Sequence, residues 1–396
     1  VCPTRSTTLS PRQRIILLRE IREIDQRGES MPDDLAQDYA EMARGSCVRD
    51  SMCITACPVK IDTGLLMKEL DQAESSIVGR SMAGFAATNF GTTAKAARMG
   101  LSLGAGVLSG NALTRGVMTA GASLLHALAP ALVPHIDAKT PLPRPAPPVP
   151  KPTGTGVRDV VYFPSCVSRI VGALPGESEL STMEATLRCL EASGRRVIIP
   201  ANIEGLCCGL AFSSKSHDGA AQRSMSAAQK ALSEATRGGE LAVVTDASPC
   251  ALQFAQHGPM KIRVLDFVQY WRREVMTEAD APKGVLRGRA ILHPTCSLTK
   301  LDAVEDLKAV AAAHSEDPVV PLRAACCGFA GNQGFVRPEI TEGATRAEAE
   351  DVRGLMNGAE TAYSTCRTCE IGMTRATKLS YASAAHLVYR ALGLKS

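Results

Sequence analysis

Residues 163–166 read FPSC and residues 293–296 read HPTC. The first residue of each quartet is the last residue of a short, largely apolar run. The runs at 157–163 and 289–293 have the length and β-branched content of buried strands. Similar runs at 197–200 and 241–244 alternate with helical stretches, which is the pattern of an α/β domain. Because this order recurs, the sequence predicts two duplicated α/β domains. Their cysteines would then lie at the carboxyl ends of strands, where such folds place their sites.

A vicinal cysteine pair followed by glycine also occurs twice, as Cys207-Cys208-Gly209 and as Cys326-Cys327-Gly328. Adjacent cysteines rarely form a disulfide with each other, because the bridge needs Cα atoms farther apart than neighbours comfortably allow. Two thiolates side by side on a glycine turn are instead well placed to bind a metal or the edge of a cluster. We therefore expect a metal site in each half.

The two halves offer different numbers of thiolates. The rear cysteine set consists of Cys296, Cys326, Cys327, Cys366 and Cys369. Five thiolates exceed what tetrahedral zinc needs, so a polynuclear iron–sulfur cluster is the favoured occupant, with zinc as the alternative. The front cysteine set consists of Cys166, Cys207, Cys208 and Cys250, with Gln253 expected where a fifth cysteine would fall. Four thiolates can hold either a cluster or a structural zinc ion, and both interpretations stay open here.

Residues 47–58 are close to a bacterial ferredoxin run, C-x2-C-x2-C-x3-C-P. Cys47, Cys53 and Cys57 occupy three of its cysteine positions, and Asp50 occupies the fourth. The Asp50 carboxylate can serve as a harder iron ligand. The alternative is that Asp50 caps a helix or pairs with Arg49 and contacts no iron.

The dipeptide Cys2-Pro3 resembles the end of an earlier ferredoxin run. In two-cluster ferredoxins the fourth cysteine of one run ligates the cluster of the other. Cys2 is thus expected to complete a cluster with Cys47, Cys53 and Asp50. Cys57 would ligate a different cluster, whose other ligands lie upstream. The chain begins with Val1, and we expect it to be a fragment; the alternative is a chance terminal cysteine.

The chain has 396 residues and the sequence predicts a multidomain protein. Fourteen cysteines indicate a reducing compartment, where metal or redox use is commoner than a disulfide framework. A net charge of +4 is nearly balanced for this length and does not indicate nucleic acid as a partner. The uncharged stretch 116–134 favours a packed helical hairpin over a membrane span. We expect five segments: an α-helical ferredoxin-like domain (1–80), a small-residue helical segment (81–137), a proline-rich linker (138–156), and cysteine-rich α/β domains at 157–281 and 282–396.

Together these motifs resemble the cysteine-rich (CCG) domains of heterodisulfide reductase and of the iron–sulfur subunits of glycolate oxidase and anaerobic glycerol-3-phosphate dehydrogenase. The nearest resemblance is to the C-terminal iron–sulfur half of FAD-linked D-lactate dehydrogenases of the cytochrome or quinone type. It covers nearly the whole chain. The stretches that carry it are CPTR at 2–5, LSPRQRI at 9–15, the run at 47–64, CCGFAGN at 326–332 and STCRTCEIGM at 364–373.

The resemblance implies an enzyme that oxidises D-lactate or a similar 2-hydroxy acid at FAD and passes electrons through [4Fe-4S] centres to a cytochrome or quinone acceptor. It implies a non-cubane [4Fe-4S] cluster on the rear cysteine set. The FAD site and the catalytic residues would lie on an upstream domain, so this fragment alone would be inactive. The implied location is cytoplasmic, with peripheral contact at the inner face of the cytoplasmic membrane.

Three other functions are compatible with the motifs. The chain can be a separate iron–sulfur subunit of a glycolate- or glycerol-3-phosphate-type dehydrogenase. It can be a thiol–disulfide catalyst in which the rear cluster itself binds substrate sulfur. It can also be an interaction module that zinc stabilises and that has no redox role.

Overall fold

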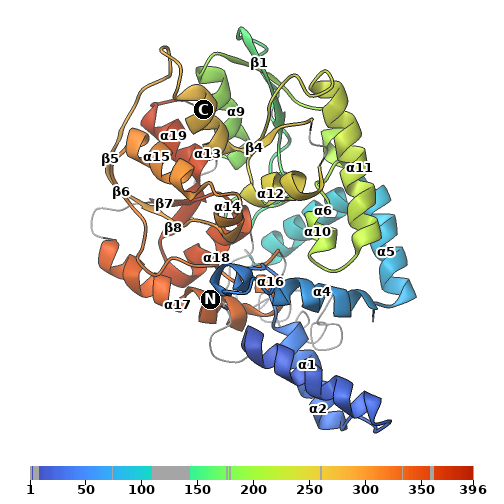
Figure 1. The fold of residues 1–396 in the computed structure, drawn as a ribbon. Helices are drawn as coiled ribbons and strands as arrows, with labels where there is room; N and C mark the ends of the chain where they lie inside the picture. The colour runs from blue at the N-terminus through green and yellow to red at the C-terminus, as the bar shows by residue number, and fades with distance from the viewer. Residues whose placement is uncertain are drawn as a thin grey trace.

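The computed structural model describes residues 2, 9–73, 75–108, 143–174, 177, 180–258, 261–331, 333–356 and 361–395. Over these residues a helical N-terminal region precedes two α/β halves (Figure 1). Each half is built around one parallel sheet of four strands. The fold class predicted from the sequence is therefore confirmed for the two α/β halves, while the ferredoxin-like character of the N-terminal region stays a prediction.

The two sheets have the same topology. The front sheet has the order β2-β1-β3-β4 and the rear sheet the order β6-β5-β7-β8, with every pairing parallel. Equal strand order in both halves confirms the internal duplication. The strands are β1 (Arg158–Phe163), β2 (Arg195–Ile198), β3 (Val243–Thr245), β4 (Val264–Asp266), β5 (Leu286–Leu292), β6 (Ser315–Val319), β7 (Thr361–Ser364) and β8 (Ser380–Ser383).

This strand order explains why the cysteines meet. In each half, the second strand along the chain pairs on one side of the first strand, and the third strand pairs on its other side. The first and third strands therefore flank a topological switch point. Open α/β sheets bind their ligands at such points, outside the carboxyl ends of the strands. Helices that begin at these ends carry cysteines: α8 (Cys166–Ile170), α12 (Ser248–His257), α14 (Cys296–Lys300) and α18 (Arg367–Thr377).

A layer of four helices lies between the two sheets (Figure 1). Helix α9 of the front half packs on α19 of the rear half, and α13 packs on α15. One apolar core runs from Tyr162 of β1 through this layer to Leu292 of β5. The two halves are thus joined by a common core. The helices of the layer are α9 (Thr182–Ala192), α13 (Phe267–Tyr270), α15 (Val304–His314) and α19 (Ala384–Ala391), with the π-helical turn η3 (Trp271–Val275) continuing α13.

Other helices cover the outer faces of the sheets. Met225 and Leu232 of α11 pack on Val161 and Val243 of the front sheet. Val352 of α17 and residues of α18 pack on the rear sheet in the same way. Each sheet is therefore buried on both faces, as parallel sheets usually are. These outer elements are η2 (Ile203–Gly205), α10 (Leu210–Ser213), α11 (Asp218–Ala235), α16 (Gln333–Val336) and α17 (Pro338–Leu355).

The N-terminal region is helical, as predicted. Helix α1 begins with a capping box, in which Ser10 and Gln13 satisfy each other's backbone N–H groups. In Figure 1, α1 and α2 project away from the two halves, whereas α5 lies against α11. Helix α6 packs on α8. The elements are α1 (Pro11–Gln26), α2 (Asp33–Asp38), η1 (Tyr39–Gly45), α3 (Cys53–Ala56), α4 (Thr63–Ala73), α5 (Ile77–Thr88) and α6 (Phe90–Leu108).

The proline-rich stretch is described from residue 143 onward, and it pairs with the front half. The backbone N–H of Arg144 donates to the carbonyl of Ala173 (2.9 Å), and that of Ala146 donates to Ile170 (3.0 Å). Most of the predicted small-residue segment, including the stretch 116–134, lies outside the described residues; α5 and α6 account for its described part. None of the helices in the described ranges is both long enough and apolar enough to cross a membrane.

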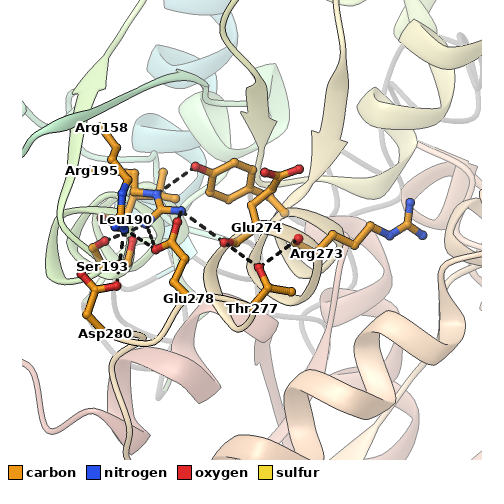
Figure 2. Close-up of polar contacts among 10 residues, drawn as sticks. Arg158, Leu190, Ser193, Arg195, Arg273, Glu274, Thr277, Glu278 and Asp280 are labelled. Carbon is orange, nitrogen blue, oxygen red and sulfur yellow. Dashed lines mark hydrogen bonds and ion pairs between the residues drawn. The ribbon is translucent and has the colours of Figure 1, made fainter.

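At the end of the front sheet away from the cysteines, arginines at the strand starts converge on Glu278 (Figure 2). The buried Arg195 guanidinium contacts the Glu278 carboxylate at 2.6 and 2.7 Å and donates to the Tyr270 hydroxyl at 3.0 Å. Arg158 reaches the same carboxylate at 2.5 Å. Because this network lies at the opposite end of the strands from the cysteines, we assign it a structural role.

Asp266 makes the stability of the fold depend on pH. Its carboxylate caps α13 by accepting from the Val268 N–H (2.9 Å), and burial raises the pKa of Asp266 to about 8. The native carboxyl stays protonated up to that pH, whereas the unfolded one ionises near pH 4. We therefore expect the free energy of unfolding to fall as pH rises from about 4 to about 8, by at most about 1.4 kcal/mol per pH unit from this group. Asp266→Asn should remove that slope in urea unfolding measured between pH 5 and pH 8.

The exposed Asp33 provides a matched control, since Asp33→Asn should leave the pH dependence unchanged. Equal slopes in the wild type and in Asp266→Asn would contradict the prediction.

Candidate metal centres

The structure places the sulfurs of the front cysteine set in two close pairs. The Sγ atoms of Cys166 and Cys207 lie 3.7 Å apart, and those of Cys208 and Cys250 lie 3.3 Å apart. The backbone N–H of Gly209 donates to the Cys207 sulfur at 3.4 Å. Gly209 has a φ of 88°, a conformation that favours glycine, so the glycine of the motif is what allows this turn.

Without a cation, this cluster of thiols resists ionisation. The Cys166 thiol lowers the pKa of Cys207, but Cys208 and burial outweigh it and raise that pKa to about 12. For Cys250, the hydrogen bond with Cys208 lowers the pKa, and burial with the neighbouring sulfurs raises it to about 11. Four deprotonated sulfurs at this spacing therefore need a bound cation, and the donor set fits zinc or a cluster.

Arg169 is a buried residue beside the front cysteines that the sequence analysis did not single out. It is 1% exposed, and its guanidinium donates to the carbonyls of Pro164 (3.1 Å) and Leu206. Its Nη1 atom is buried and has no hydrogen-bond partner among the described residues. The positive charge lowers the pKa of Cys166, although Cys207 and burial raise that pKa overall. Arg169 thus places a cation beside the front thiols; its only signal in the sequence is a position three residues after Cys166.

Helix α6 covers the front cysteine set. Phe90 and Ala94 are buried against Cys207, and Cys166, Ile170 and Phe212 complete the apolar contact. Water is thereby kept from this side of the sulfurs, which affects both the redox potential and the exchange of a bound metal.

Four cysteines of the rear set lie in two groups, each beside one residue that is not a cysteine. One ring nitrogen of His293 and the sulfurs of Cys327 and Cys369 all lie within 4.8 Å of one another. A carboxylate oxygen of Asp50 forms a second such group with the sulfurs of Cys296 and Cys326. The Cys327 and Cys369 sulfurs are 3.1 Å apart, and the Gly328 N–H donates to Cys326 at 3.5 Å.

Two of the rear thiols ionise more easily than the front ones, whereas hydrogen bonds with neighbouring cysteines and burial raise the pKa of Cys326 and of Cys369. A hydrogen bond from Cys369 and the charge of His293 outweigh burial and lower the pKa of Cys327 to about 5. Hydrogen bonds from Cys369 and Thr368 lower the pKa of Cys366 to about 7, again against burial. The thiolate is the form that binds metal, so part of the rear set is ready to bind at neutral pH.

The two halves can be matched position by position through their helix starts. Helix α12 begins at Ser248 and α18 at Arg367, so Cys250 corresponds to Cys369. Ala247 then stands where Cys366 precedes the rear helix. The expectation that Gln253 marks the missing cysteine is wrong. It matched Cys250 to Cys366, the first cysteine of the rear C-x2-C pair, whereas the helix starts match Cys250 to the second, Cys369.

Asp50 lies at the rear cysteine set. Its Oδ1 atom accepts from the Met52 N–H (3.2 Å), and its Oδ2 atom is buried without a hydrogen-bond partner in the described structure. Arg49 forms its ion pair with Asp71. The structure thus brings Asp50 from the ferredoxin-like run to within ligand distance of sulfurs that follow it by more than 240 positions in the sequence.

The cysteines of the ferredoxin-like run lie nearby in the N-terminal region. The Arg14 guanidinium approaches the Cys2 sulfur at 3.7 Å, and its charge lowers the pKa of the buried Cys47, which burial raises. Thr63 donates its hydroxyl to the Cys53 sulfur at 3.1 Å, and Cys57 ends α3. The ligand set of Cys2, Cys47, Asp50, Cys53 and Cys57 stays a prediction.

The N-terminal region and both halves meet beside these sites. Gln333 of the rear half donates to the carbonyl of Gly45 (3.0 Å) and accepts from Lys215 of the front half (3.4 Å). Burial and the charge of Arg49 lower the pKa of Lys215, while burial and Lys300 lower that of Lys68. Several cations therefore gather at this junction, where they offset the negative charge of thiolates.

The residues present fit an iron–sulfur cluster at the rear. Five buried or partly buried sulfurs, a backbone N–H and a neighbouring imidazole form a soft donor set with hydrogen bonds to sulfur. The front cysteine set fits either zinc or a cluster by the same criteria.

Comparison with known proteins agrees with this assignment. The family model for the cysteine-rich domain CCG matches residues 160–255 and again residues 290–374. These segments run from the first to the third strand of each half and contain the nine cysteines of the front and rear sets. No curated protein and no solved structure matches the chain. Both halves are thus similar to the CCG cysteine-rich domain, which is typical of the iron–sulfur parts of redox enzymes.

Proposed function

We propose that this chain is the iron–sulfur electron-transfer portion of a flavin-dependent D-lactate dehydrogenase and passes electrons from FAD to a cytochrome or quinone. The observation that carries the proposal is the group formed by Asp50, Cys296 and Cys326. It brings one residue of the ferredoxin-like run beside two cysteines of the rear set, so the proposed ligands of the two regions approach each other at Asp50. A relay of electrons between centres requires that kind of proximity.

In this proposal the rear cysteine set holds a [4Fe-4S] cluster, which supplies one-electron chemistry. The protein's own residues bind the cluster, exclude water and adjust its charge. The Gly328 N–H donates to sulfur, and the cations at the junction favour the reduced, more negative state. The front cysteine set, which α6 covers, holds a second cluster or a structural zinc ion.

The experiment that tests the redox role is analysis of the chain purified without oxygen. Iron, acid-labile sulfide and zinc are measured, and electron paramagnetic resonance spectra are recorded before and after dithionite. Iron and sulfide for at least two clusters, with a signal that changes on reduction, would support electron transfer. Zinc with negligible sulfide would overturn it in favour of a zinc-stabilised module.

The substrate is tested on the complete gene product. D-lactate, L-lactate, glycolate and glycerol 3-phosphate are compared as donors that bleach the iron–sulfur absorbance. Bleaching by D-lactate would support the proposal. Bleaching by glycolate or glycerol 3-phosphate alone would favour a separate subunit of those dehydrogenases. Oxidation of the reduced protein by a disulfide, with a new paramagnetic signal, would favour a thiol–disulfide catalyst.

We further propose that helices α5 and α6 bring the protein to an anionic membrane surface, where a quinone acceptor would be available. Six large apolar side chains of these helices are at least 59% exposed: Ile77, Val78, Met82, Phe85, Met99 and Leu103. Residues 75–108 contain no Asp or Glu, while Arg80, Lys95 and Arg98 supply positive charge. Exposed apolar faces with basic residues are typical of interfacial helices.

The membrane surface is tested by sedimentation with vesicles. We expect the wild type to bind vesicles that contain phosphatidylglycerol. Phe85→Asp should weaken this binding by about tenfold or more, since burying a Phe side chain contributes roughly 1.5–3 kcal/mol. Leu322→Asp, at a 95% exposed residue of the rear half, is the matched control and should bind normally. Equal binding of all three proteins would contradict the proposal.

A further inference from the structure

His293 occupies a position that the duplication leaves different in the two halves. It directly follows β5 and is fully buried, and the residue that matches it in the front half is Phe163. The front residue packs in an apolar core against Phe254. The rear half thus replaces a core phenylalanine by an imidazole at the carboxyl end of its central strand.

One side of the His293 ring is held by a carboxylate. Its Nδ1 atom lies 2.7 Å from Oε1 of Glu348, which is 2% exposed. The other oxygen of Glu348, Oε2, accepts from the backbone N–H of Ala325 at 3.3 Å, and Ala325 directly precedes the rear cysteine pair. This pairing orients the ring with Nδ1 toward Glu348, and a metal ion at Nε2 would take the place of the proton that the charged imidazole carries there.

The other side of the ring faces the sulfurs. Nε2 of His293 is buried and has no nitrogen or oxygen partner among the described residues, while the Cys327 sulfur is close enough to interact with the ring. A ring nitrogen of His293 and the sulfurs of Cys327 and Cys369 lie within 4.8 Å of one another. A buried polar atom without a partner is costly, and a bound metal would satisfy it.

We propose that His293 is an imidazole ligand, through Nε2, of a metal ion bound by Cys327 and Cys369, and that Glu348 is its positioning residue. Metal-ligating histidines almost always donate a hydrogen bond from their other ring N–H to a carboxylate or carbonyl, and Nδ1 of His293 is paired with Glu348 in this way. Nitrogen and sulfur ligands suit iron and zinc alike. The inference deepens the proposed function, but it holds for a cluster iron or a zinc ion, so it can fail or succeed independently of electron transfer.

The test uses the full chain purified without oxygen, with all histidines carrying either ¹⁴N or ¹⁵N. If the rear centre contains iron, pulsed electron paramagnetic resonance of the reduced protein should show a nitrogen coupling that changes with the isotope. His293→Cys should retain the metal and lose that coupling. If the centre contains zinc, the bound zinc is replaced by Co²⁺, and the visible spectrum of His293→Cys should shift toward an all-sulfur site.

Further variants separate a ligand from a structural histidine. Glu348→Gln should keep the nitrogen coupling and speed loss of the metal to a chelator by about 10–100-fold. His386→Gln is the matched control, because His386 is also buried in the rear half but its Nε2 atom lies 3.0 Å from the Leu180 carbonyl. It should change neither the spectrum nor the metal content.

The outcome that overturns the inference is a spectrum of the rear centre that is the same in His293→Cys and in the wild type. An unchanged rate of metal loss in Glu348→Gln would likewise show that Glu348 does not position His293. Circular dichroism checks that each variant is folded, and His293→Gln provides a second variant of similar size.

Discussion

Cys327→Ser is expected to weaken metal binding at the rear cysteine set by more than a hundredfold, so that a chelator removes this metal while the front set keeps its own. Cys327 is the rear thiol whose pKa falls to about 5, and its sulfur lies close to the Cys369 sulfur and to a ring nitrogen of His293. Structural metal sites contribute about 10–16 kcal/mol in total, so one of four or five ligands accounts for roughly 3 kcal/mol, or more than a hundredfold in affinity. Iron and sulfide, or zinc, should fall by the content of one site.

The matched control is Cys189→Ser. Cys189 is also fully buried, but its sulfur contacts the carbonyl of Ala385 in the helical layer and belongs to neither set. Metal content should be unchanged in this variant. If both variants lost the same amount of metal, the loss would reflect unfolding and the ligand assignment would be wrong.

Trp271→Ala is expected to lower the free energy of unfolding by about 3–5 kcal/mol, the usual cost of removing a large buried aromatic side chain. Trp271 is fully buried, stacks on Phe267 with ring centroids 5.4 Å apart, and donates its N–H to Nε2 of His314 at 2.9 Å. The variant also leaves that nitrogen without its donor. Urea unfolding followed by circular dichroism measures the change.

Trp271 lies in the core that both halves share, so its removal should destabilise the two halves together in one transition. Leu322→Ala, at a 95% exposed side chain, is the control and should change stability by less than about 0.5 kcal/mol. Two separate transitions in the variant, with only one of them shifted, would show that the helical layer does not couple the halves.

Much of the fold could be predicted from local patterns. The apolar runs before FPSC and HPTC predict β1 and β5, and the structure places Cys166 and Cys296 at the first residues of the helices that follow. The cysteine-glycine motifs predict a site in each half, and the structure places cysteine sulfurs there in close pairs. These features are predictable because a strand followed by a helix start is encoded within about ten consecutive residues.

Local sequence patterns were sufficient for the two α/β halves and for the cysteines that begin helices after β1 and β5, while the metal-binding sets stay a prediction. Tertiary packing was needed to bring Asp50 to the rear set, to show that Ala247 takes the place of Cys366, and to hold His293 toward the sulfurs through Glu348. The reason is physical. Local residue patterns set the backbone of an element, but contacts between residues 55 or 246 positions apart depend on how separate elements pack, and no local pattern encodes that packing.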